Sequence, residues 1–146
     1  MASLRRGAAR GAPARSDPLL RELAILEVAR LSGSDYEWVQ HEAITRSLGG
    51  TQSQIQAIVS GEHAELRDIE RAVLGFVREV VLEVRASDAT LTKVREHLSS
   101  REVVELLLVI GQYMAVARLA ATTGIEVDEP ANLAIVNAAT QDGGKA

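Results

Sequence analysis

The segment from residue 100 to 123 constrains the fold most, because it reads as one long helix with almost no polar face. Ser99 and Glu102 have the spacing of a capping box, and Gly124 is the residue type that most often ends a helix. Between them lies the sequence VVELLLVIGQYMAVARLAA. A helix that is apolar all round must be covered on all sides. In a chain of 146 residues we therefore expect it to lie in the core and also in an oligomer interface.

Five further helices are predicted from the spacing of apolar side chains and from the residues that begin and end each segment. Asp17 and Pro18 start the first helix, and Thr51 with Gln54 forms a second capping box. The predicted segments are residues 18–32, 34–48, 52–60, 66–85 and 88–98. The chain also has only three prolines, so we expect an all-α fold, an oligomeric bundle of about six helices.

The two ends of the chain differ in character from the middle. Residues 1–16 hold four arginines among Gly, Ala and Pro and lack the apolar stretch of a secretory signal, so a disordered basic tail is expected. Residues 17–130 are expected to form one helical domain. Residues 131–146 are expected to be an extension with a short helix at 131–138 and a disordered end.

Cysteine is absent from the sequence, and its absence excludes whole classes of chemistry. The chain can form no disulfide, thiolate metal site or thiol nucleophile. The three histidines are dispersed, so no metal site is expected, and no other cofactor is expected either. A cysteine-free chain fits a reducing compartment, and we expect a cytoplasmic location.

The charge and the hydropathy of the chain argue against two kinds of partner, nucleic acid and membranes. The net charge is -4 and no basic stripe is present, so nucleic acid is not expected as a partner. No uninterrupted apolar run reaches the roughly 18 residues of a membrane span, so no membrane is expected.

Glu37 and His41 are the pair of residues that most directly suggests chemistry. They lie four positions apart, so their side chains share one face of a helix. A carboxylate beside an imidazole fixes the ring tautomer and makes a general acid/base pair. Tyr36 and Trp38 stand beside them in a chain with four aromatic residues in all. The alternatives are a solvated surface pair and, for Trp38, a core or interface anchor.

The same stretch resembles the carboxymuconolactone decarboxylase and alkyl hydroperoxidase D-like family. The hydroperoxidase branch of that family has a Glu, eleven residues, and then Cys-x-x-Cys-x-x-x-His. Here Glu22 is followed at the same spacing by Ser34, Glu37 and His41, so both acid/base positions match and both thiols are replaced. A Glu four residues before the His is similar to the decarboxylase branch.

The resemblance extends over roughly residues 18–128 and includes the segment 101–113. It implies a helical fold, a homotrimer or homohexamer, and a small-molecule substrate handled without a cofactor. The true decarboxylases tend to carry Gly-x-Pro after the tyrosine of the last helix, whereas Met and Ala follow Tyr113 here. Their own substrate is therefore not implied.

The resemblance also suggests a role for each site residue. His41 would move a proton at carbon, Glu37 would orient and charge the imidazole, and Glu22 would relay or hold a second proton. Either Arg21 or Arg46 would neutralise a substrate carboxylate. The candidate substrate-binding residues are Arg21, Ser34, Tyr36, Trp38, Arg46, Gln112 and Tyr113.

Three functions remain open from the sequence. The first is cofactor-free decarboxylation or isomerisation of a small organic acid or lactone. The second is a non-catalytic oligomeric binding or scaffold protein. The third is a peroxidase-related antioxidant role, which is disfavoured because that reaction needs a thiolate.

Four further residues are expected to have a structural role or to lie on the surface, rather than to bind a substrate. Glu105 is expected to pair with an arginine across helices, because a carboxylate within an apolar run needs a partner. Gly111 is expected to permit close helix packing. His63 and His97 are expected to be surface residues near helix ends.

Overall fold

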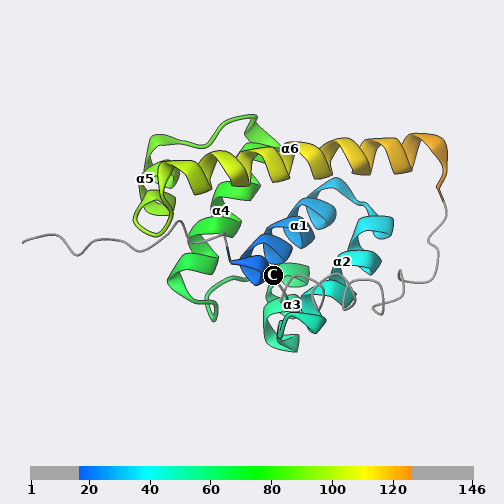
Figure 1. Cartoon of the computed structure of the whole chain (residues 1–146), viewed down its shortest axis with the longest axis horizontal. Helices are drawn as coiled ribbons and strands as arrows, with labels where there is room; N and C mark the ends of the chain where they lie inside the picture. The colour runs from blue at the N-terminus through cyan, green and yellow to red at the C-terminus, as the bar shows by residue number, and fades with distance from the viewer. Residues whose placement is uncertain (1–16, 126–146) are drawn as a thin grey trace, which may run out of the picture.

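A computed structural model describes residues 17–125, and this part of the chain is entirely helical, with no strand. The helices are α1 (Pro18–Ser32), α2 (Asp35–Ser47), α3 (Gln52–Ser60), α4 (Asp68–Glu83), α5 (Asp88–Arg95) and α6 (Ser100–Thr123) (Figure 1). The all-α prediction is confirmed. The basic tail and the C-terminal extension predicted from the sequence lie outside the described residues.

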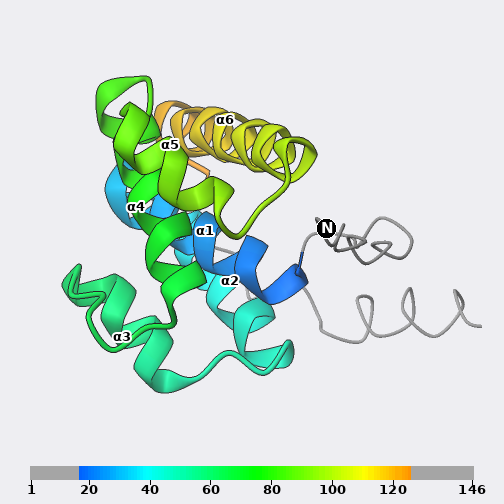
Figure 2. The same cartoon turned by 90° about the vertical axis from the view of Figure 1, so that its left-hand side faces the viewer.

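Helix α1 is the centre of the bundle. It packs against α2, α3, α4 and α6. Helix α6 runs along one edge of the bundle, with α1 and α4 beneath it, and the end-on view shows that its outer side faces away from the other helices (Figures 1 and 2). The fully buried apolar side chains of α1 include Leu23, Leu26 and Val28.

The expectation that α6 lies in the core holds for one of its faces, and the predicted oligomer interface stays a prediction. Its inner face is buried at Val103, Leu106 and Ile110, whereas Leu108 on its outer face is 69% exposed. Helix α1 holds the central position instead. Apolar composition shows that a helix needs cover, but it does not show how much of that cover the same chain supplies.

Cap residues set most of the helix ends. Asp17 accepts a hydrogen bond from the Leu19 amide, and the capping boxes at Thr51 and Ser99 are both formed. The ends of α4 and α5 come earlier than the spacing predicted. Helix α4 stops at Glu83 because Val84 adopts a left-handed conformation with φ of 71°.

Helix α6 has the length and the composition of a membrane-spanning segment, although Glu105 and Arg118 interrupt its apolar run. Within its most apolar stretch, 28% of the residues are buried inside the molecule. The core helix of a soluble protein meets the same criteria, so this finding by itself is weak evidence for a membrane.

Replacement of Val84 by glycine should stabilise the protein. A β-branched residue in the left-handed region costs about 1–2 kcal/mol that glycine does not pay. Val84 is 88% exposed, so little packing is lost. Urea unfolding should show a free energy of unfolding about 1 kcal/mol higher for Val84→Gly. The matched control is Leu82→Gly, which should lower stability because Leu82 lies within α4. Equal destabilisation by both changes would contradict the account.

Candidate active site

Glu22 of α1 and His41 of α2 meet inside the bundle. Their Oε2 and Nδ1 atoms are 2.7 Å apart, and Glu22 is 3% exposed. The chain reverses direction between the two helices through Gly33, which has φ of 63°, and Ser34 then caps α2. An ionised carboxylate only accepts hydrogen bonds, so Nδ1 of His41 donates to Glu22. The bond fixes the ring and leaves Nε2 as the atom available for proton transfer.

Glu37 is a buried carboxyl group without a hydrogen bond. It is 1% exposed, and neither of its side-chain oxygens has a hydrogen-bond partner among the described residues. Burial raises the pKa of Glu37, and the Ser34 hydroxyl and the His41 ring oppose the rise only in part. The Ser34 hydroxyl instead accepts from the Glu37 amide at 3.4 Å. Glu37 therefore keeps a proton to a higher pH than a solvent-exposed glutamate does.

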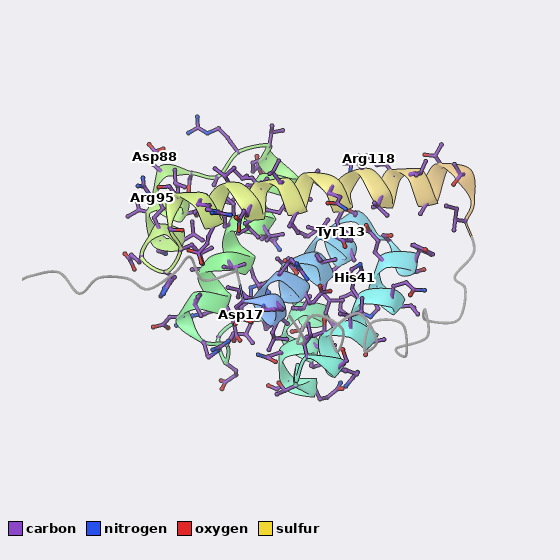
Figure 3. All side chains as sticks on the ribbon, viewed as in Figure 1. Asp17, His41, Asp88, Arg95, Tyr113 and Arg118 are labelled. Carbon is purple, nitrogen blue, oxygen red and sulfur yellow. The ribbon has the colours of Figure 1, made fainter. Side chains whose placement is uncertain are left out.

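Tyr113 brings α6 into the same site. Its ring packs edge-on against the His41 ring, with centroids 4.8 Å apart and planes at 89° (Figure 3). Burial raises the pKa of Tyr113, and the charge of Glu22 raises it further. The phenol thus stays protonated and forms a wall of the site. The structure therefore joins Glu22, Glu37, His41 and Tyr113 from three helices.

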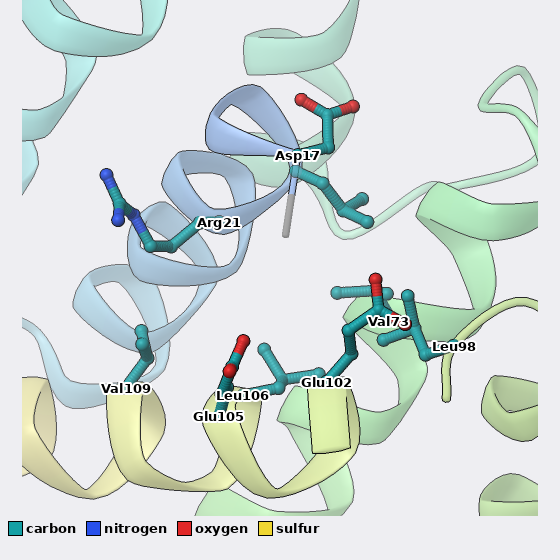
Figure 4. A pocket seen from close by; sticks show the side chains of 9 residues that line it. Asp17, Arg21, Val73, Leu98, Glu102, Glu105, Leu106 and Val109 are labelled. Carbon is teal, nitrogen blue, oxygen red and sulfur yellow. The ribbon is translucent and has the colours of Figure 1, made fainter. Parts of the chain in front are cut away.

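Arg21 is the cation beside this group. Its Nε lies 3.6 Å from Oε1 of Glu22, and its side chain is half exposed. On its other side Arg21 lines a small cavity of about 40 Å³, with Glu105 at the same rim and Leu106 and Val109 among its apolar walls (Figure 4). Arg21 thus stands between the buried pair and the surface.

A larger hollow adjoins the start of α2. It has a volume of about 310 Å³ and is lined by Ala29, Arg30, Gly33, Ser34, Asp35, Trp38 and Val59. Two predicted substrate-binding residues, Ser34 and Trp38, therefore share a concave surface, although the Trp38 indole donates to Glu42 at 2.9 Å. Tyr36 is half buried on the same helix.

Two predicted substrate-binding residues lie apart from this group. Arg46 is bound at 2.7 Å by both Glu42 and Gln52 near the surface. Gln112 is exposed, whereas its neighbour Tyr113 faces His41. Consecutive residues of a helix point about 100° apart, so only one of the two can face the site.

The structure also tests the predictions made for Glu105, His97 and His63. Glu105 does pair with an arginine, but with Arg101 of its own helix at 2.8 Å rather than across helices. His97 is exposed, as expected. His63 is half buried with its Nε2 atom buried and unbonded, and burial lowers the pKa of His63, so the surface prediction was wrong. A helical pattern predicts the face of a helix but not the burial of residues in the loop that follows.

Sequence reasoning missed a second buried acid on α1. Glu27 is fully buried, and Arg30 binds both of its oxygens at 2.9 and 2.7 Å. Arg30 also lines the larger hollow. Glu27 and Arg30 lie three positions apart, a spacing at which two side chains of one helix can pair, so the sequence could have predicted this ion pair.

No family model and no curated protein matches the sequence. Two solved structures are similar to the helical domain. One is a protein of unknown function from Agrobacterium tumefaciens, proposed to be the antioxidant defence protein AhpD. It is 23% identical, with a TM-score of 0.70 over 75% of this chain and 77% of its own. The other is an uncharacterised peroxidase-related protein from Silicibacter sp. TM1040, 21% identical, with a TM-score of 0.71 over 80% of this chain.

The chain has the alkyl hydroperoxidase D-like fold. The resemblance predicted from the Glu22 to His41 spacing is thereby confirmed at the level of the fold. The chain spans 62% of the length of the Silicibacter protein. Within this alkyl hydroperoxidase D-like fold, the present chain has no thiol and instead has Ser34 and Glu37 beside His41.

The pKa of Glu37 predicts how stability depends on pH. A carboxyl group whose pKa is higher in the folded protein than in the unfolded chain favours folding at low pH. This contribution to stability is lost as the pH rises from 4.5, the ordinary pKa of the group, through the pKa in the folded protein. Glu37→Gln cannot ionise, so its free energy of unfolding should exceed that of the wild type by an amount that grows over this range. Urea unfolding at a series of pH values measures the difference.

The control for this experiment is Glu42→Gln. Glu42 lies on the same helix but is partly exposed and paired with Arg46, so the change should not produce a growing advantage. A constant difference between wild type and Glu37→Gln across the pH series would show that Glu37 titrates normally.

Proposed function

We propose that the protein is a cofactor-free acid/base enzyme that decarboxylates or isomerises a small organic acid or lactone. The observation that carries the proposal is the Glu22–His41 bond of 2.7 Å beside a buried, unbonded Glu37. These groups supply a base with a fixed ring and a separate proton donor. Two ionisable groups held in different protonation states by their surroundings are a common arrangement in proton-transfer enzymes.

For an isomerisation, Nε2 of His41 would take a proton from the carbon next to the substrate carboxylate. The electron pair would move into the conjugated system, and His41 or Glu37 would protonate the carbon two positions further along the substrate. If Glu37 is the donor, it would then take up the proton that His41 holds. Glu22 would stabilise the imidazolium while it exists. The proton count at the end equals that at the start, so no other reactant is needed.

For a decarboxylation, the bond between the carboxylate carbon and its neighbour would break. Carbon dioxide would leave, and the electron pair would remain on the substrate carbon as an enolate. Protonated Glu37 or the His41 imidazolium would then protonate that carbon, and the donor would regain its proton from water. Arg21 is half exposed and lies 3.6 Å from Glu22, so it would attract the carboxylate of an entering substrate.

A non-catalytic binding or scaffold protein is the second candidate function. It is favoured by the packing of His41, whose side chain is 12% exposed. His41 does not line the hollow beside Arg21, the hollow beside Trp38 or a further one beside Arg118, although the second of these reaches Ser34. Under this alternative, the Glu22–His41 bond joins two helices and nothing more. A thiol-dependent peroxidase activity is not proposed, because the chain has no cysteine.

Hydrogen exchange at carbon tests the two candidates across a range of possible substrates. The protein is incubated in deuterated water with a panel of β,γ-unsaturated acids and carboxylated lactones, and proton NMR follows deuterium incorporation and product formation. His41→Ala should lower the rate on any active compound about 10²–10⁴-fold, because a positioned acid/base contributes that much. Glu22→Gln should also lower the rate.

His97→Ala is the matched control, because His97 is exposed and outside the site. It should leave the rate unchanged. Full activity of His41→Ala would exclude the proposed mechanism. Absence of exchange with the whole panel, for a wild type that is folded, would favour the scaffold.

A further inference from the structure

A hollow lies beside the second half of α6, where the last turns of α1 and α4 reach that helix. Figure 1 shows the end of α1 beneath this part of α6. The hollow has a volume of about 390 Å³, and small-molecule sites commonly have volumes of about 300–1,000 Å³. We call it the α6 hollow. Its apolar walls are Leu31 of α1, Val81 and Leu82 of α4, and Ala117 and Ala121 of α6.

The small side chains of α6 leave this space open. In the first half of the helix, the buried side chains are large, as at Leu106 and Ile110. In the second half, the buried Ala117 and then Ala121 one turn later line the α6 hollow. On the facing wall Leu82 is 51% exposed, so a large apolar side chain borders the space without full cover. Removal of such surface from water is favourable, so the α6 hollow suits a ligand with an apolar body.

Arg118 is the charged residue among those that line the α6 hollow, and it forms no ion pair with a described residue. Its Nη1 atom donates to the Met114 carbonyl of the same helix at 2.8 Å. In contrast, Arg21 and Arg30, which line the other two hollows, are both paired with glutamates. An arginine without an acidic partner can bind the carboxylate of a ligand through charge-assisted hydrogen bonds.

The helix ends around the α6 hollow determine which way such a ligand would lie. Helix α1 ends at Ser32 and α4 ends at Glu83, and the C-terminal end of a helix carries a partial negative charge. An anionic group is therefore disfavoured on that side and favoured at Arg118 on α6. The apolar chain of the ligand then lies toward Leu31 and Leu82. A single arginine also suits a carboxylate better than a phosphate group, which carries nearly two negative charges.

We propose that the α6 hollow binds a medium-chain carboxylic acid as its anion, with the carboxylate on Arg118 and the chain between α1, α4 and α6. This is a second ligand site of the molecule. The inference does not depend on the proposed function, because no residue that lines the α6 hollow belongs to the group around His41. Loss of binding at Arg118 and loss of proton transfer at His41 are therefore separate results.

A series of ligands tests the shape and the charge preference of the α6 hollow. Isothermal titration calorimetry is done with straight-chain carboxylates from butanoate to dodecanoate, each below its micelle-forming concentration. Each added methylene should tighten binding about three- to fourfold until the space is full, and the affinity should then level off. Octan-1-ol, which has the same chain length as octanoate but no charge, should bind at least tenfold more weakly than octanoate.

Three results of this series would overturn the proposal. The first is that no carboxylate binds to the folded wild type. The second is equal affinity for octanoate and octan-1-ol, which would show that the anion is not recognised. The third is an affinity that rises with every added methylene and never levels off, which would show detergent-like adsorption to exposed apolar surface.

Arg118→Gln tests the position of the carboxylate. The change should lower the affinity for octanoate at least tenfold and leave that for octan-1-ol unchanged, because it removes the charge and keeps a polar side chain. Arg95→Gln is the matched control, since Arg95 is exposed and lies on the opposite side of the molecule (Figure 3). It should alter neither affinity. An unchanged preference for octanoate in Arg118→Gln would contradict the proposed site.

Ala121→Leu tests the position of the apolar chain. The larger side chain should fill part of the α6 hollow and weaken the binding of octanoate at least tenfold. Ala115→Leu is the control, because Ala115 is exposed and lies two positions before Ala117, so it points away from the space. Leu82→Asp is a second variant, in case the change at Ala121 moves α6, and it should also weaken binding. Wild-type affinity in both folded variants would place the ligand elsewhere and overturn the proposal.

Discussion

The carboxylate of Glu22 lies on the helix around which the bundle packs, and its bond to His41 is the contact on which the site depends. A buried carboxylate left without a partner costs about 3–5 kcal/mol. The 2.7 Å bond to His41 avoids that cost and holds α1 against α2 at one defined point. Glu27 lies further along α1 and finds its partner in Arg30. The central helix can therefore be buried on all sides although it carries two acids.

Glu37 is the exception to this pairing, and it lies next to His41 in the site. A polar group that is buried and unbonded lowers stability, so such groups are rare away from functional sites. Here the group occupies the position of the second thiol in the hydroperoxidase motif. A carboxyl group cannot carry the redox chemistry of a thiol, and burial raises the pKa of Glu37. The helices around it nevertheless form the alkyl hydroperoxidase D-like fold.

Helix α6 connects the site to the surface. Its inner face supplies Tyr113 to the His41 ring and buries Ile110 in the core. Its outer face exposes Leu108, so one helix meets two different environments. The bundle holds α6 in place through α1 and α4. The absence of a polar face in the sequence therefore predicts the buried face of α6 but not its exposed one.

The sequence by itself determined the features that local geometry controls. The helical period and the cap residues predicted the helices, and the spacing of Glu37 and His41 placed them on one face. The absence of cysteine excluded thiol chemistry. The family resemblance also selected Glu22 correctly as a member of the group around His41. These features depend on hydrogen bonds and side chains within a few residues, which a sequence displays directly.

Only the tertiary structure decided which residues meet and how deeply each is buried. It joined Glu22 to His41 across 19 positions, and it turned Tyr113 rather than Gln112 toward the site. It also left Glu37 without a partner and made α1 rather than α6 the central helix. The physical reason is that burial, and the pKa values that follow from it, depend on how whole helices pack against one another. The sequence records which side chains are apolar or charged, but that packing decides which of them are removed from water.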